Sequence, residues 1–423
     1  MPDSAPPGLP RRAAFVFIFI TVVLDMLALG MIVPVLPKLV LTFVHGDAVT
    51  GARMYGLFGT AWAVMQFLCA PVLGSLSDRF GRRPVVLLSN LGLGLDYLLM
   101  ANATSLGWLF VGRVVSGITA ASVSTAGAYV ADVTPVERRA GAFGLLGAAF
   151  GIGFVVGPAV GGVLGAINPR LPFWVAAALS LANAAYGSLV LPESLAPERR
   201  AAFSWRRANP IGALQRLRSH RELFGFSVVL FLSGVAHEAL PSTFVLYATY
   251  RYGWNERTIG ITLAIVGVCS AIVQAGLVRA VVARFGERRA LLFGLMCGAS
   301  GFAVFGLAAS GIVFGAGIPL MAFWGMSGPA AQGLMTRRVE ASAQGQLQGA
   351  TSSVRGIAGL IGPGLFTFTF ASFIGQHQAL KLPGAPFLLS SLLLMAAFVV
   401  TFRIAAEGGA ARPEPEPRSD GGM

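Results

Sequence analysis

The sequence predicts an all-α membrane protein with twelve transmembrane helices in two pseudo-symmetric bundles of six. The chain of 423 residues is 55% hydrophobic and only 12% charged, with a mean hydropathy of +0.73. Soluble domains carry about 25% charged residues, and a helix that spans a bilayer needs about 20 apolar residues. Twelve runs meet this description, at 13–36, 54–76, 84–103, 106–131, 140–166, 172–191, 222–247, 257–282, 288–309, 311–335, 345–374 and 384–404.

A polar segment and a short repeat divide these runs into two groups. The only long polar stretch inside the chain, residues 193–221, is rich in arginine and separates the sixth run from the seventh. Arg79-Phe80-Gly81 recurs 205 residues later as Arg284-Phe285-Gly286, and Gly157-Pro158 recurs at the same offset as Gly362-Pro363. We therefore predict a disordered N-terminus (1–12), a first bundle (13–192), a basic linker (193–221), a second bundle (222–405) and a disordered tail (406–423).

The net charge of +13 is distributed as in a membrane protein. Most arginines fall in the segments that lie on one side, and the other side holds only Lys38, Arg53, Arg170, Arg251, Arg257 and Lys381. Cytoplasmic loops carry an excess of Lys and Arg, so both termini are predicted to be cytoplasmic, with arginines near the lipid headgroups. No nucleic-acid partner is predicted. The three cysteines lack metal-ligand spacing, so no metal site is predicted, and no nucleophile–base pair suggests an enzyme.

Several predicted helices carry ionisable side chains at membrane depth, where each costs several kcal/mol unless it is paired or hydrated. Asp25 lies near the middle of the first helix, where it either takes up a proton or forms a permanent ion pair with Arg113 of the fourth helix. Asp96 in the third helix is either a further coupling residue or is solvated at the outer end. These acids are candidates for proton coupling.

The second bundle has its own candidates. His237 and Glu238 are adjacent in the seventh helix and either take part in proton coupling or cap a helix break at Pro241. Arg355 of the eleventh helix either binds an anionic group of the substrate or neutralises Glu238. Hydrogen-bonding side chains that could line a substrate cavity are Gln66, Asn183, Tyr186, Gln274 and Gln332.

Two motifs carry a family resemblance. The loop from Gly74 to Pro84 reads Gly-x-x-x-Asp-Arg-x-Gly-Arg-Arg, and the fifth helix contains Gly-x-x-x-Gly-Pro-x-x-Gly-Gly from Gly153 to Gly162. The first resembles the signature loop of the major facilitator superfamily, and the second resembles a motif found mainly in its exporters. Further stretches resemble the tetracycline/proton antiporters of that superfamily: Leu24-Asp25-Met26, Leu95-Asp96-Tyr97 and Gln344-Gly345-Gln346-Leu347-Gln348-Gly349.

The resemblance implies a major facilitator fold and a proton-coupled exporter of drug-like molecules in the bacterial inner membrane. It would act as a monomer and use the proton gradient in place of a cofactor, because no nucleotide-binding loop is present. It also implies a cytoplasmic network of gating charges formed by Asp78, Arg79, Arg82 and Asp132. Glycine and proline lower helix stability and bend helices, so Gly157-Pro158 and Gly362-Pro363 are predicted hinges.

The sequence departs from the tetracycline type at two positions. A histidine is typical of the eighth helix and an acid of the ninth, whereas this chain carries Ser270 and Gly298 there. The substrate, and whether tetracycline is one, therefore stays open. The alternative within the same fold is a proton-coupled transporter of a metabolite such as a sugar or an organic acid. A membrane receptor or scaffold without transport is the alternative of another class.

Overall fold

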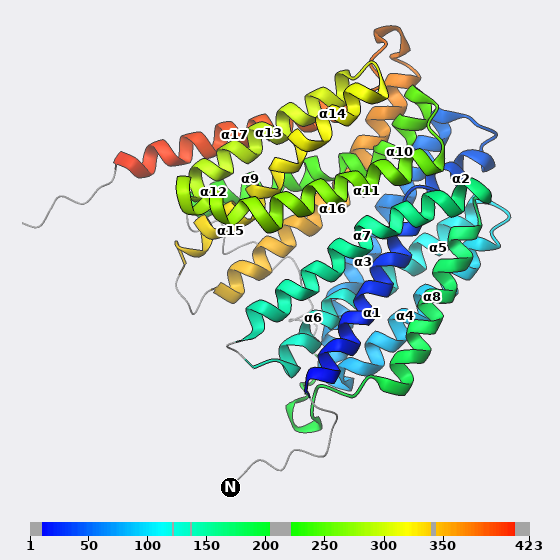
Figure 1. The fold of residues 1–423 in the computed structure, drawn as a ribbon, viewed down its shortest axis with the longest axis vertical. Helices are drawn as coiled ribbons and strands as arrows, with labels where there is room; N and C mark the ends of the chain where they lie inside the picture. Colours follow the sequence, from blue (N-terminus) through cyan, green and yellow to red (C-terminus); the bar gives the residue numbers. More distant parts are fainter. Residues whose placement is uncertain (1–10, 121, 136–137, 204–220, 340–343, 411–423) are drawn as a thin grey trace, which may run out of the picture.

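A computed structural model of the chain describes residues 11–120, 122–135, 138–203, 221–339 and 344–410, and these contain helices but no strand (Figure 1). The helices of the first half are α1 (Arg11–Ile32), α2 (Leu36–Phe43), α3 (Ala48–Phe80), α4 (Arg82–Ala101), α5 (Leu106–Thr119), α6 (Ser122–Val133), α7 (Arg139–Ile167) and α8 (Leu171–Val190), followed by the 3₁₀ turn η2 (Pro197–Arg199). Those of the second half are α9 (Arg221–His237), α10 (Ala239–Tyr252), α11 (Glu256–Ile272), α12 (Val278–Phe285), α13 (Glu287–Leu307), α14 (Gly311–Ala322), α15 (Ser327–Thr336), α16 (Gln344–Ile374) and α17 (Ala385–Ala410). Shorter turns are η4 (Val273–Leu277), η5 (Phe323–Met326) and η7 (Gln378–Leu380).

The described helices account for all twelve predicted spans. Eleven are long and apolar enough to cross a membrane. The predicted fourth span corresponds to the shorter apolar helix α5 and to α6, on either side of residue 121. The predicted fold class is therefore confirmed. Residues 204–220, most of the predicted linker, and the predicted disordered ends 1–10 and 411–423 lie outside the described residues, and α17 continues five residues beyond the predicted boundary at 405.

Three spans of the second half change their helical geometry near the middle. The seventh breaks between α9 and α10, where Pro241 has no N–H to donate to the carbonyl of His237 four residues earlier. The eighth contains the π-helical turn η4, and the tenth contains the 3₁₀ turn η5. Such turns recur at functional sites, so the middle of this half is a candidate location for one.

The two halves pack with the same pattern, in agreement with the internal repeat. In the first half, α7 packs against α1 and also against α11 of the second half. In the second half, α16 packs against α9 and also against α3 of the first half. Glycines allow these close approaches: a Cβ on Gly260 of α11 would lie 2.9 Å from the Cα of Gly162 of α7, and a Cβ on Gly59 of α3 would lie 3.0 Å from Pro363 of α16.

The halves are joined at one side of the molecule. We call the side where α1 begins and α17 ends the terminal side, and the other the opposite side. On the opposite side the Lys38 ammonium lies 3.3 Å from the Glu256 carboxylate and donates to the Trp254 carbonyl at 3.0 Å. The Tyr55 hydroxyl also reaches the carbonyl of Pro241 at 3.5 Å. The halves lie together around α2 and α10 and diverge toward the terminal side (Figure 1).

Candidate functional site

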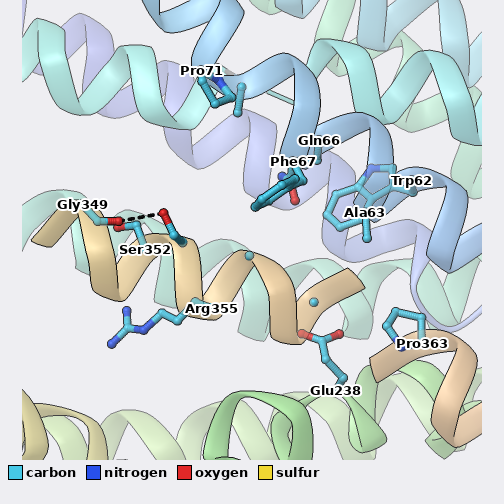
Figure 2. A pocket seen from close by; sticks show the side chains of 14 residues that line it. Trp62, Ala63, Gln66, Phe67, Pro71, Glu238, Gly349, Ser352, Arg355 and Pro363 are labelled. Carbon is cyan, nitrogen blue, oxygen red and sulfur yellow. Dashed lines mark hydrogen bonds between the residues drawn. The ribbon is translucent and has the colours of Figure 1, made fainter. Parts of the chain in front are cut away.

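A cavity of about 710 Å³ lies between the halves (Figure 2). Its walls are residues 62–71 of α3 and 349–363 of α16, with Glu238 from the α9–α10 break. On the opposite side it ends where Gly56 and Gly59 of α3 meet Thr367 and Pro363 of α16. Of the predicted site residues, the structure places Gln66, Glu238, Arg355 and Pro363 in this wall. The cavity therefore lies on the terminal side of the closed contact.

A second cavity, of about 530 Å³, lies within the second half and shares Glu238 and Arg355 with the first. The three irregular spans meet around it: His237 ends α9, Gln274 belongs to η4, and Trp324 belongs to η5. The two charged residues thus stand where the cavities adjoin.

Glu238 owes its position to the helix break and to a glycine. It is the residue between α9 and α10, and a Cβ on Gly362 of α16 would collide with its side chain. Gly362 therefore lets the glutamate lie against α16, beside the predicted hinge at Pro363. Within the described part of the chain, no hydrogen bond or ion pair joins Glu238 to Arg355, so the predicted neutralisation by direct pairing does not occur.

An aromatic ring fills the place of the acid that is typical of the ninth helix. A Cβ on Gly298 of α13 would lie 2.7 Å from Cγ of Trp324 and 2.9 Å from a methyl carbon of Leu394. The Trp324 ring also lies 5.8 Å from the His237 ring, measured between centroids. A longer side chain at Gly298 has no room, and the only carboxylate in the walls of the two cavities is Glu238.

In the first half, Asp25 is held by amides. Asp25 is 4% exposed. The buried Asn183 amide of α8 donates to its carboxylate at 2.9 Å and to the Thr21 carbonyl at 3.1 Å. The Asn90 amide of α4 donates to both carboxylate oxygens, at 3.1 and 3.2 Å, in the orientation that satisfies its neighbours. Asn183 was predicted to line a cavity, but it lies in the wall of neither cavity and fixes Asp25.

Asp96 and Arg113 are two further buried charged residues of the first half. Asp96 is 2% exposed, and neither carboxylate oxygen has a hydrogen-bond partner among the described residues. The structure thus places it in the core of the half, not at a solvated outer end. Arg113 is also buried, and its guanidinium lies 5.4 Å from the centroid of the Trp62 ring. Trp62 lines the cavity, so this buried charge lies against a ring of the cavity wall.

Three of the four predicted gating charges, Asp78, Arg82 and Asp132, come together at the terminal side. The Arg82 side chain donates to Asp78 at 2.5 Å, to Asp132 at 3.1 Å and to the Ser77 hydroxyl at 2.7 Å. Arg79 lies apart from this network, with its guanidinium 5.1 Å from the centroid of the Phe80 ring. The network therefore ties the α3–α4 loop to the end of α6.

Glu193, which belongs to none of the sequence motifs, completes this region. Its carboxylate accepts from the backbone N–H groups of Arg82 at 2.8 Å and Arg83 at 3.3 Å, the first residues of α4, and from those of Ser194 and Leu195 at 3.0 Å. Anions are favoured at a helix N-terminus. The segment after α8 is thus fastened to the signature loop.

The remaining predicted residues lie elsewhere. Tyr186 packs on Phe17 of α1, with ring centroids 5.8 Å apart. Gln332 of α15 keeps a buried amide nitrogen without a partner among the described residues. Neither belongs to the walls of the two cavities. Gly157 of α7 lies against α1, where a Cβ would come 2.8 Å from the Cα of Gly30, and Pro158 contacts the same glycine. Trp62, Phe67, Phe305 and Trp324 place their rings in the cavity walls, and no local pattern distinguishes them among 30 phenylalanines and 6 tryptophans.

Two related helical halves around a central cavity are the architecture of secondary transporters. The Major Facilitator Superfamily matches residues 18–363, and the chain belongs to this family. It is 39% identical to the class C tetracycline resistance protein of Escherichia coli, over 85% of this chain and 90% of that one. It is 33% identical to the class H protein of Pasteurella multocida, over 91% and 96%.

Solved structures share the fold. The human organic anion transporter MFSD10 (TETRAN) is 25% identical with a TM-score of 0.68, and the match covers 93% of this chain and all of that one. A bacterial homologue of the human lysosomal transporter Spinster, described as inward-facing and unoccupied, is 18% identical with a TM-score of 0.74, over 97% of this chain and all of that one.

Proposed function

We propose that the protein is a proton-coupled antiporter that exports drug-like small molecules, of the kind handled by tetracycline resistance proteins, across a bacterial cytoplasmic membrane. The observation that carries this proposal is the cavity between the halves, closed on the opposite side and bounded by a carboxylate at membrane depth. The identity to tetracycline resistance proteins along most of the chain supports the substrate class. The protein acts as a monomer and needs no cofactor besides the proton gradient.

The arrangement of basic residues supports an orientation with both termini in the cytoplasm. The terminal side carries the arginines of the α3–α4 loop, the start of α7, the start of α13 and the end of α15. Loops rich in arginine stay in the cytoplasm. The cavity then opens to the cytoplasm, which is the state that receives a solute for export.

Export requires that the closed and open sides exchange. The halves rock about the cavity, so the Lys38–Glu256 contact separates while the terminal side closes. The Arg82 network with Asp78 and Asp132 lies on the terminal side and acts as the switch element that has different partners in the two states.

Protons drive the exchange through side chains that are costly to keep charged. A proton from outside neutralises Asp25 or the His237–Glu238 pair, with Asp96 as a further acceptor, and favours the state open to the cytoplasm. Release of that proton into the cytoplasm is coupled to capture of the substrate. The positive charges of Arg113 and Arg355 stabilise the deprotonated carboxylates of these acids without direct contact.

The test is transport in inverted membrane vesicles that contain the full-length protein. We expect uptake of tetracycline or of ethidium when the vesicle interior is acidified, and its loss when a protonophore is added. Vesicles without the protein are the control. Uptake that continues at the same rate after the gradient collapses would contradict the coupling, and uptake of neither compound would contradict the substrate class.

A second candidate is a proton-coupled transporter of an organic acid. It is favoured by the exposed guanidinium of Arg355 in the cavity wall and by the likeness to a protein described as an organic anion transporter. On this reading Arg355→Ala abolishes uptake of acidic solutes, and a variant that keeps full uptake of every acidic solute excludes it.

A further inference from the structure

Two opposite charges share the cavity wall without neutralising each other. Glu238 and Arg355 both line the cavity between the halves, and neither side chain has a hydrogen bond or ion pair to another described residue. An ionisable group at membrane depth costs several kcal/mol unless it is paired or hydrated. A carboxylate and a guanidinium that both face a cavity without pairing are therefore positioned to meet charges on a ligand.

The helix α16 fixes the separation of these charges. Glu238 lies against Gly362, which follows Arg355 by seven residues, or two helical turns on the same face. At about 1.5 Å per residue the two positions are about 10 Å apart along the axis. Helix side chains lean toward the N-terminus, and the Arg355 side chain points toward the Gly349 end of α16 while Glu238 lies at the Pro363 end (Figure 2). The two groups are therefore too far apart to pair.

The wall between the charges is open at Gly359. Gly359 lies midway between the two positions, lines the cavity, and has no atom within 4 Å of an added Cβ. Next to Arg355, a Cβ on Gly356 would lie 2.7 Å from the ring of Phe67, which with Trp62 supplies the aromatic rings of the α3 wall. The open space is therefore at Gly359, and a planar ring there would lie beside the aromatic side chains of α3, on which rings stack favourably.

We propose that this cavity binds rigid aromatic zwitterions whose cationic and anionic groups lie at opposite ends of the ring system, with a separation on the order of 10 Å. The inference rests on the proposed function and names its substrate class. Arg355 binds the carboxylate of the ligand, for which its planar guanidinium offers paired hydrogen bonds. Glu238 binds the ammonium group, and the rings lie over Gly359. A ligand with a single charge leaves one of the two protein charges without a partner, so it binds more weakly.

The test compares three ligands that differ only in charge. They are a quinolone carboxylic acid with a piperazine ring, which is zwitterionic near neutral pH, its methyl ester, which keeps only the cation, and its N-acetyl derivative, which keeps only the anion. Binding to the purified full-length protein is measured by calorimetry and by quenching of tryptophan fluorescence. We expect the zwitterion to bind about tenfold more tightly than either derivative, the fold-change for one charge-assisted hydrogen bond.

Variants assign each charge to its partner. Arg355→Gln is expected to weaken binding of the zwitterion and of the N-acetyl derivative about tenfold and to leave binding of the ester unchanged. Glu238→Gln is expected to weaken binding of the zwitterion and of the ester by the same factor and to leave binding of the N-acetyl derivative unchanged. Arg279→Gln and Glu198→Gln, which remove exposed charges outside both cavity walls, are matched controls that leave all three unchanged. If a neutral variant does not fold, Arg355→Lys and Glu238→Asp retain the charge and are expected to keep the preference for the zwitterion.

Equal binding of the three ligands, or parallel weakening of all three by both variants, overturns the inference. The outcome is separable from that of the proposed function. If the three ligands bind equally but uptake into vesicles depends on the proton gradient, only the zwitterion site is overturned. If the zwitterion binds selectively but uptake does not depend on the gradient, only the proton coupling is overturned.

Discussion

The Lys38–Glu256 contact is predicted to hold the state that is closed on the opposite side. The Lys38 ammonium lies 3.3 Å from the carboxylate, and both side chains are 16% exposed. Exposed ion pairs contribute about 0.2–1 kcal/mol, and breaking a fully buried pair costs about 3–5 kcal/mol. A pair of intermediate burial is therefore worth about 1–2 kcal/mol, which corresponds to a factor of about 5–30 in an equilibrium constant. Lys38→Ala should shift the two states by this factor.

Electron spin resonance between two labels measures that shift. Gly141 of α7 and Gly276 of η4 lie in different halves, and neither has an atom within 4 Å of an added Cβ, so both tolerate a labelled cysteine once the three native cysteines are replaced. We expect Lys38→Ala and Glu256→Ala each to raise the ratio of short to long distances about 5–30-fold. The double variant should add little to either single variant.

Arg53→Ala removes an exposed charge from the same side and is the control that leaves the distances unchanged. If both single variants keep the wild-type distribution, or if their effects add fully, the ion pair does not hold this state.

The remaining predictions concern the cavity, the signature loop and the proton site. Gly359→Leu should block export in the vesicle assay because its side chain fills the cavity next to α16. The control Gly315→Leu, which also has open space at its Cβ, should transport normally. Equal transport by both variants would contradict the placement of the substrate. Glu193→Gln should lower the free energy of unfolding by about 1–2 kcal/mol because a charged acceptor is lost from the N-terminus of α4. Glu198→Gln is the control, and equal melting temperatures of the two variants would show that Glu193 does not stabilise α4. Asp25→Asn should abolish gradient-driven export while ligand binding measured by calorimetry persists, and gradient-driven export by this variant would remove Asp25 from the coupling.

Much of the fold follows from the sequence because hydropathy and local spacing determine it. Twelve apolar runs predict the spans, and the resemblance of residues 74–84 to the signature loop predicts that Asp78 and Arg82 share one charge network. The break at His237 also follows from a local rule, because Pro241 cannot complete the helical hydrogen bond.

The site was less predictable because it depends on how each helix is rotated about its axis. Gln66 and Asn183 look alike in sequence, yet one lines the cavity and the other is buried against Asp25. The contact between Glu193 and the N–H of Arg82 joins residues 111 positions apart. The ring of Trp324 over Gly298 likewise joins two helices, and no local pattern indicates it.

Antiport requires that the protein moves protons in one direction and substrate in the other through one cavity. Proton flux in liposomes that contain the purified protein tests it most directly. Liposomes loaded with a substrate and a pH-sensitive dye are diluted into substrate-free buffer at equal pH. Antiport predicts that the interior becomes more acidic as the substrate leaves, and that Glu238→Gln slows both fluxes together. Substrate efflux without a change in internal pH would contradict the account.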